Sequence, residues 1–280
     1  MNGVRRPVLT AVLLALAGCA APAPPVSLSS PPPSVPSATR PSVPSSAPSS
    51  APPSSTSTAP PAVAPVVVPV VVLDPGHNGG NAGAPEVINR PVPAGRGRTK
   101  PCNTTSTATD AGFPEHVFTW SVALLVRDAL TARGVRVVLT RPDDDGVGPC
   151  VNERAAVGNR ARAAAVVSIH ADGSIDPGAR GFHVAYSAPP LNPAQGAPTL
   201  RLAEAMRDAL RASFPVSTYI GRDGLSPRND LGGLNLSQRP AVLVECGNMR
   251  NPDEAAAFAS ESGRRAYATA IAAGILAYLG

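Results

Sequence analysis

Two histidines and a glutamate each follow a short apolar run of the sequence. The segment VVVLDPGHNGG carries His77, AAAVVSIHAD carries His170, and PAVLVECGN carries Glu245. Runs of this kind are typical of buried strands in a parallel sheet, and the carboxyl ends of such strands form the edge where ligands bind. Imidazole and carboxylate, with no cysteine pair nearby, are the ligand types of a catalytic zinc that keeps one position open for water. The pattern therefore indicates a metal site at one edge of a sheet.

The elements that must position these residues alternate between strand and helix patterns. Strands are expected over 66–73, 135–140, 166–170, 181–186 and 241–245, and helices over 114–134, 151–164, 200–212 and 263–279. Alternation of this kind predicts an α/β fold. We expect a single domain with a mostly parallel central β-sheet of about six strands, covered by helices on both faces.

A third metal ligand is needed, and two candidates are adjacent at the start of the first expected helix. Successive helical residues point about 100° apart, so Glu115 and His116 cannot both face one metal. A carboxylate is also the favoured charge at a helix N-terminus, which gives Glu115 a purely structural alternative role.

The N-terminus has the pattern of an export leader. Two arginines precede an apolar stretch over 7–17 that is too short to span a bilayer as a stable helix. The tetrapeptide Leu-Ala-Gly-Cys that ends at Cys19 looks like a bacterial lipobox. We therefore expect a lipoprotein-type signal peptide over 1–18 and a lipid on Cys19. Ordinary secretory cleavage after Ala17 is the alternative, and both predict export.

A change of composition separates a linker from the folded domain. Residues 19–65 are rich in Pro, Ser and Ala and carry almost no charge. Such a segment cannot bury enough apolar surface to offset its ordering entropy, which predicts a disordered linker. The remaining residues, 66–280, are a suitable length for one catalytic domain.

Export determines how the other three cysteines are interpreted. Cys102 and Cys150 lie in segments expected to be loops, and outside the cytoplasm two such cysteines can pair. We predict a Cys102–Cys150 disulfide. Zinc binding by these two is the rival reading, although no CxxC spacing accompanies them. Cys246 directly follows a strand and is expected to be a small buried thiol.

The charge is a weak indication of partners. The formal net charge is +5 at pH 7, and no basic run is interleaved with aromatic residues. Together with the export signal, this excludes nucleic acid as an expected partner. A mild positive balance suits an anionic wall polymer. We expect a monomer.

Four segments together resemble a known family. LDPGHNGG, FPEHVFTWSVALLVRDAL, SIHAD and PAVLVECGNMRN occur in the order seen in the zinc-dependent N-acetylmuramoyl-L-alanine amidases of the amidase-3 family. The resemblance extends over 66–280. It implies that His77, Glu115 and His170 bind one Zn²⁺ per chain and that Glu245 is the catalytic carboxylate, acting first as general base and then as general acid.

The resemblance also implies the function and the setting. The expected enzyme is an exported peptidoglycan hydrolase that cuts the amide between N-acetylmuramic acid and L-alanine of the stem peptide. Its partners would be peptidoglycan or muropeptide fragments and, through the lipid on Cys19, the membrane that faces the cell wall. Two alternatives stay open: another zinc hydrolase of the same polymer, a carboxypeptidase or deacetylase, and a non-catalytic wall-binding lipoprotein.

Several further side chains have expected roles that the structure can check. Glu245 has an alternative role as a strand-end carboxylate paired with Arg154 or Arg250. Asn78 and Asp172 are expected to orient the two histidines by accepting hydrogen bonds from them, and Trp120 is expected to pack in the core. His183 is expected to be a structural histidine with its hydrogen bonds satisfied, with substrate binding as the alternative. The remaining expectations are structural or substrate-flanking roles for Asn152, Arg154 and Asn159, and a flap or surface hairpin over 78–112.

Overall fold

The structure is a computed structural model that describes residues 68–176 and 178–280. The expected signal peptide over 1–18, Cys19 and the linker over 19–65 lie outside the described residues. Their assignment stays a prediction.

Six strands of the described chain form one central sheet. Their bounds are β1 (Val70–Pro75), β4 (Arg136–Leu139), β5 (Ala165–Asp172), β6 (His183–Ser187), β7 (Leu225–Arg228) and β8 (Ala241–Asn248). Their order across the sheet is β4-β1-β5-β8-β6-β7. The first four are mutually parallel, β6 runs antiparallel to β8, and β7 is parallel to β6. The expected single α/β domain with a mostly parallel sheet of about six strands is therefore confirmed.

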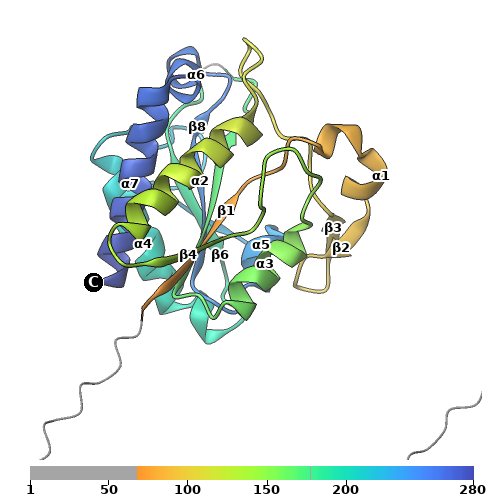
Figure 1. Cartoon of the computed structure of the whole chain (residues 1–280), viewed down its shortest axis with the longest axis vertical. Coiled ribbons are helices and arrows are strands. Elements are labelled where there is room, and N and C mark those ends of the chain that lie inside the picture. The colour runs from red at the N-terminus through yellow and green to blue at the C-terminus, as the bar shows by residue number, and fades with distance from the viewer. Residues whose placement is uncertain (1–67, 177) are drawn as a thin grey trace, which may run out of the picture. The chain divides into compact units, whose positions relative to one another are not determined.

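Helices cover both faces of the sheet (Figure 1). The helical elements are η1 (Asn81–Gly83), α1 (Pro85–Ile88), α2 (Glu115–Thr131), α3 (Val151–Arg160), η2 (Pro193–Gln195), α4 (Ala197–Arg211), α5 (Gly232–Leu236), α6 (Pro252–Ala259) and α7 (Glu261–Leu279). Helices α2, α4 and α7 pack over the larger core, and α3 and α5 cover the opposite face. Within the described ranges, no helix has the length and apolar character that crossing a bilayer requires.

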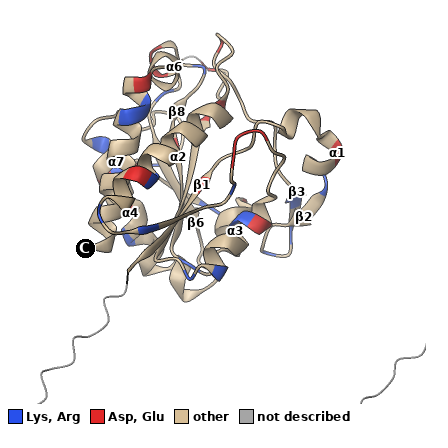
Figure 2. Cartoon of the chain, in the orientation of Figure 1, with Lys and Arg blue, Asp and Glu red and all other residues tan. Residues whose placement is uncertain are grey.

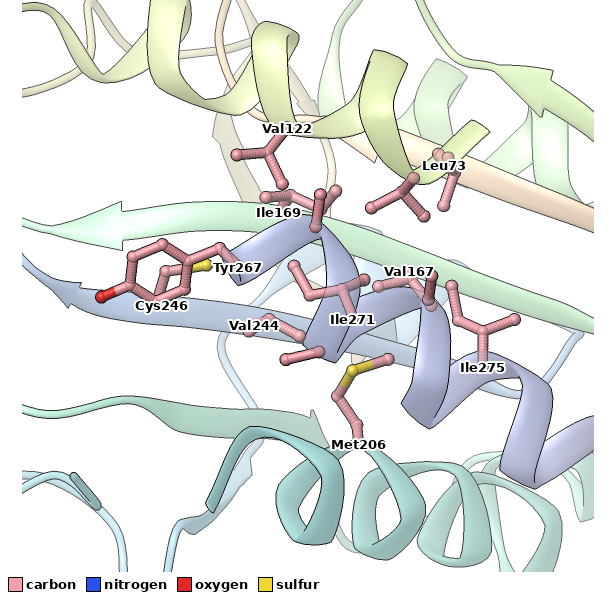
Figure 3. Packing of buried hydrophobic residues seen from close by; sticks show 14 of the residues in the cluster. Leu73, Val122, Val167, Ile169, Met206, Val244, Cys246, Tyr267, Ile271 and Ile275 are labelled. Atoms are coloured by element: carbon pink, nitrogen blue, oxygen red, sulfur yellow. The ribbon is translucent and has the colours of Figure 1, made fainter. Parts of the chain in front are cut away.

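The larger core lies between the sheet and helices α2, α4 and α7 (Figure 3). Ile271 and Ile275 of α7 lie against the sheet and beside Met206 of α4, and all three side chains are fully buried. Gly274 permits this close approach, because a Cβ there would lie 2.9 Å from the Met206 Cα. Removal of this apolar surface from water is the main favourable contribution to the stability of the sheet that carries the site.

The alternation of side chains along β5 decides which face carries His170. Val167 and Ile169 belong to the larger core, whereas Val166 belongs to the smaller core under α3 and α5. Successive strand residues point to opposite faces, so His170 shares the face of Val166. The same period in β8 puts Glu245 on that face, because it is the register partner of His170.

Residues 78–112 contain the hairpin that was one of the two expectations for them, formed by β2 (Pro91–Pro93) and β3 (Thr99–Pro101), and they also contain η1 and α1. The structure differs from the sequence expectations elsewhere. The edge strand β7 was not expected, because LSPR carries a proline and no apolar alternation. Helices α5 and α6 were also missed. They are short, and neither has the length at which a helical period becomes readable.

The predicted disulfide is present. Cys102 and Cys150 are bonded across 48 residues, and both are buried beside Val92 of the β2–β3 hairpin. The bond joins the end of the hairpin segment to the residue that precedes α3. Cys246 is a free buried thiol, as the sequence suggested. The rival role of Cys102 and Cys150 as zinc ligands is excluded by their pairing.

Candidate metal centre and catalytic carboxylate

His77 lies just beyond β1 in a left-handed backbone conformation, with φ +59°. Non-glycine residues rarely adopt this region, and such strain persists only where the surroundings hold it. Arg154 provides that hold, because its guanidinium donates to the carbonyl oxygens of His77 at 2.6 Å and Pro75 at 2.7 Å. These hydrogen bonds hold the backbone of the loop through its carbonyl oxygens, and the His77 imidazole faces the site.

Thr104 orients the imidazole of His77. Its Oγ1 lies 3.1 Å from His77 Nδ1, and its carbonyl oxygen lies 3.4 Å from the same atom. A proton on Nδ1 can be donated to Thr104, which leaves the Nε2 lone pair available at the site. His77 Nε2 faces the Glu115 carboxylate, with Oε2 at 3.0 Å.

His170, near the end of β5, lies directly beneath the loop that carries His77. A Cβ on Gly76 would lie only 2.3 Å from the His170 ring, so glycine is the residue that allows the ring this place. His170 Nδ1 is 3.1 Å from Glu115 Oε1. The two imidazole rings are 4.9 Å apart between centroids and nearly perpendicular, at 79°.

Glu115 is the first residue of α2 and is almost completely buried. Its two oxygens accept hydrogen bonds from the backbone amides of Ala171 and Thr107, each at 3.1 Å. Burial alone would raise the pKa of this carboxyl, but His77 and His170 outweigh that effect and hold the pKa far below its usual range. The Glu115 carboxylate therefore stays ionised.

These three residues form a compact donor set. One ligand atom of each of His77, Glu115 and His170 lies within 4.8 Å of the others. Among the described residues this is the group of His, Cys, Asp and Glu side chains with the spacing of a metal site. Two imidazole nitrogens and an ionised carboxylate fit a zinc ion better than a magnesium or calcium ion, which prefer oxygen alone.

His116, the other candidate third ligand, turns away from this cluster. Its Nδ1 lies 2.8 Å from an oxygen of Asp144, in the acidic loop that leads to α3 (the red loop in Figure 2). Adjacent helical positions thus separate as expected, with Glu115 toward the histidines and His116 toward the loop.

Glu245 lies beside the cluster in β8, between His170 of β5 and His183 of β6 in the strand register. Its Oε2 is buried and has no hydrogen-bond partner in the described part of the chain. Burial, together with the negative charges of Glu115 and Asp172, raises the pKa of the Glu245 carboxyl well above its usual value. A partly buried carboxyl with an unpartnered oxygen, next to a candidate metal site, is suited to proton transfer.

The alternative ion pairs for Glu245 are not formed. Arg154 pairs with Asp74 at 2.8 Å, and Arg250 pairs with Asp110 at 2.7 Å. The structural role considered for Glu245 therefore has no support in its contacts.

His183 is buried at the start of β6, but it is not the satisfied structural histidine that the sequence suggested. Its Nδ1 has no hydrogen-bond partner among the described residues. Burial lowers the pKa of His183 to about 4, although the charge of Asp172 opposes that shift. A neutral imidazole therefore lies next to Glu245.

Arg141 and Arg154 are two buried arginines that hold the end of β1. Arg141 donates to the carbonyl oxygens of Pro75 and His116, and its guanidinium lies 4.8 Å from the centre of the Trp120 ring. Trp120 therefore packs against this arginine and is partly buried.

Asp74 balances the charge of Arg154. Its carboxylate also accepts hydrogen bonds from Thr140 at 2.6 Å and Ser168 at 2.7 Å. Burial would raise the pKa of Asp74, but Arg154 and these hydroxyls lower it below its usual value. Asp74, in the DPGH motif, thus has a structural role that the sequence did not reveal.

The two residues expected to orient the histidines have other hydrogen-bond partners. Asn78 donates to the Gly148 carbonyl at 3.1 Å and accepts from the Gly79 amide at 2.9 Å. Asp172 accepts a hydrogen bond from the Tyr219 hydroxyl at 2.9 Å instead of orienting His170. Asn159 joins α3 to Leu236 at the end of α5 and to Gln238 just after it, so it is structural.

Thr104 and Thr107 were missed from the sequence. Both lie in the irregular stretch between β3 and α2, where no period or motif distinguishes one threonine from the next. The only sequence signal for them was that the long segment from residue 78 to the start of α2 separates the motif of His77 from that of Glu115.

The fold and the site define an α/β protein in which two imidazoles from strand ends and a carboxylate from the start of α2 lie beside a further, partly buried carboxyl. The Amidase_3 family, described as N-acetylmuramoyl-L-alanine amidase, matches residues 71–277. The N-acetylmuramoyl-L-alanine amidase Rv3717 of Mycobacterium tuberculosis is 52% identical over 211 residues, which cover 75% of this chain and 86% of the relative.

Two solved structures are similarly related. The N-acetylmuramyl-L-alanine amidase Ami1 of Mycobacterium smegmatis is 56% identical with a TM-score of 0.73, covering 76% of this chain and 97% of the other. The apo form of Ami1 from Mycobacterium abscessus is 54% identical with a TM-score of 0.74, covering 76% of this chain and all of the other. The chain belongs to the amidase-3 family of N-acetylmuramoyl-L-alanine amidases, a class of enzymes.

Proposed function

We propose that this enzyme is a zinc-dependent peptidoglycan hydrolase that cuts the amide between the lactyl group of N-acetylmuramic acid and L-alanine of the stem peptide. One observation carries the proposal: His77, Glu115 and His170 converge within 4.8 Å, and the unpartnered Glu245 carboxyl lies beside them. The names of the relatives support the choice of bond.

His77, Glu115 and His170 would hold the zinc ion. Their fit rests on the donor set, on Thr104, which frees His77 Nε2, and on the depressed pKa of Glu115, which keeps the carboxylate ionised. When bound, zinc supplies a Lewis acid that polarises the amide carbonyl and lowers the pKa of water.

Glu245 would move the proton of the reaction. Its carboxylate accepts a proton from the attacking water as the new carbon–oxygen bond forms. The same group then donates that proton to the alanine nitrogen as the carbon–nitrogen bond breaks, so that an amine leaves instead of an amide anion. The raised pKa of the Glu245 carboxyl makes its carboxylate a stronger base than an ordinary glutamate, which favours the first step.

The test is product analysis with the mature full-length chain on defined muropeptides. The wild type should release free stem peptides and lactyl-bearing glycan, and a chelator should stop the release. Glu245→Gln should lower the rate by about 10²–10⁴-fold. The matched control is Glu261→Gln, which removes a carboxylate exposed on α7 and should leave the rate unchanged.

Each alternative predicts a different product. A carboxypeptidase would release a terminal amino acid, a deacetylase would release acetate, and a non-catalytic wall-binding protein would release nothing. Any of these results with the wild-type chain would contradict the amidase proposal.

The proposal includes export and a lipid anchor on Cys19. The support is the sequence of the leader, since residues 1–67 lie outside the described part. A linker of this length could extend about 140 Å in a polyproline II conformation, enough to bring the catalytic domain from a membrane surface to the wall. Labelling of cells with a clickable fatty acid should mark the wild type and not Cys19→Ser; equal labelling would count against lipidation.

A further inference from the structure

Lys100 is the only lysine in the sequence, and it lies at the candidate active site. It is one of 24 basic residues, all the others being arginine. Lys100 is in β3, part of the hairpin that Figure 2 shows with several basic residues. Together with His77 and His170, it lines a cleft with a volume of about 180 Å³.

The walls of this cleft are mainly apolar, and one of their charges is not balanced. The apolar lining residues include Pro101, Val151, Leu231, Leu234 and Leu243. The other permanent charges of the lining, those of Asp74 and Arg154, neutralise each other in a 2.8 Å ion pair. No carboxylate in the described chain forms an ion pair with Lys100.

Lys100 uses one of its N–H donors in the hydrogen bonds of the described chain. Its Nζ donates to the backbone carbonyl of Asp230 at 3.0 Å, a neutral acceptor. The Asp230 carboxylate is bound by Arg228 through two hydrogen bonds, at 2.8 and 2.7 Å. An ammonium group has three N–H donors, so Lys100 keeps two for a ligand. The group of Lys100, Arg228 and Asp230 carries a net charge of +1.

An unbalanced cation in an apolar cleft attracts anions, because low-dielectric walls concentrate its field. Stem peptides of peptidoglycan carry free carboxylates, and the one nearest the scissile amide is on the second residue. We propose that Lys100 binds this carboxylate and thereby makes the enzyme prefer stem peptides in which it is free over those in which it is amidated. This inference rests on the proposed function, since it names a substrate group for the same site.

The first test compares two muropeptides that differ only in amidation of the second residue. The wild-type chain should prefer the free acid by about tenfold or more in kcat/KM, the range expected for a partly buried charge pair. Lys100→Gln should abolish that preference through a higher KM for the free acid, with kcat little changed. Lys100→Arg should restore most of it, because the charge is kept.

The matched control is Arg98→Gln, which removes one positive charge from an exposed position of the same hairpin. It should keep the wild-type preference. If Arg98→Gln and Lys100→Gln lost the preference for the free acid equally, only the general charge of the hairpin would matter, and that would overturn the proposal. A preference that survives in Lys100→Gln would overturn it as well.

A second test does not depend on catalysis. Because the chain has one lysine, acetylation with an N-hydroxysuccinimide ester followed by peptide mass spectrometry reports the reactivity of Lys100 alone. In Glu245→Gln, which cannot consume the ligand, the free-acid muropeptide should protect Lys100 and the amidated one should not. Equal protection by both would refute the role of Lys100, whereas failure of the wild type to release stem peptides would refute the proposed function.

Discussion

A methyl group added at Gly76 should damage the metal centre without unfolding the protein. In Gly76→Ala the new Cβ would lie 2.3 Å from Cε1 of His170, whereas ordinary contact begins near 3.4 Å, so the ring must move by about 1.1 Å. Metal–ligand distances tolerate deviations of about 0.2 Å. The required shift is several times larger, and His170 would also lose its 3.1 Å contact with Glu115.

We expect zinc affinity to fall by about 10–100-fold, the range found when the support of a ligand is disturbed. Competition with a chromophoric chelator measures the zinc Kd, and far-UV circular dichroism checks the fold. The control is Gly83→Ala in η1, where an added Cβ meets nothing within 4 Å, and its Kd should match the wild type. A Gly76→Ala Kd within threefold of wild type would refute the steric reasoning, and a wild type that binds no zinc would refute the zinc proposal itself.

Three further predictions concern stability. Arg154→Ala removes the charge partner of buried Asp74 and should cost about 3–5 kcal/mol, or about 6–20 °C in Tm for a domain of this size. Arg160→Ala, at the exposed end of the same helix, should shift Tm little; similar Tm values for the two variants would contradict the role given to Arg154. Because the pKa of Asp74 is lowered in the folded state, its stabilising effect is present above its unfolded value and is lost as the pH falls through the folded one. Replacing Cys102 and Cys150 together by serine should cost about 4 kcal/mol, since the bond closes a loop of 48 residues in the unfolded chain, and an unchanged Tm would show that the bond adds no stability.

The site residues that could be predicted from the sequence are those that follow a strand pattern. His77, His170 and Glu245 follow apolar runs, and parallel strands bring such ends to one edge. Glu115 was different, because an acidic residue at a helix N-terminus is common for electrostatic reasons alone. Only the family resemblance distinguished its role as a ligand from that alternative.

Long-range contacts account for the residues that were missed or misplaced. The partner of Arg154 is Asp74, 80 positions earlier in the chain, and no local pattern records that pairing. The reversed direction of β6 likewise depends on its neighbour β8 and not on its own sequence. Thr104 contacts His77 across 27 positions from an irregular segment, so its role became visible only in three dimensions.

The strand order of the sheet has a consequence for the maturation of the enzyme. β1, β5 and β8 are neighbours in space, but the site residues that they deliver are far apart along the chain. Strand pairing over such separations is slow, because the entropy cost of closing a long loop comes before the stabilising contacts form. A chain that emerges N-terminus first presents His77 and Glu115 well before His170, and its two early ligands have no third to complete a site. A metal ion held by these three residues would therefore be captured late in biogenesis, and a chain interrupted before His170 would lack a complete site.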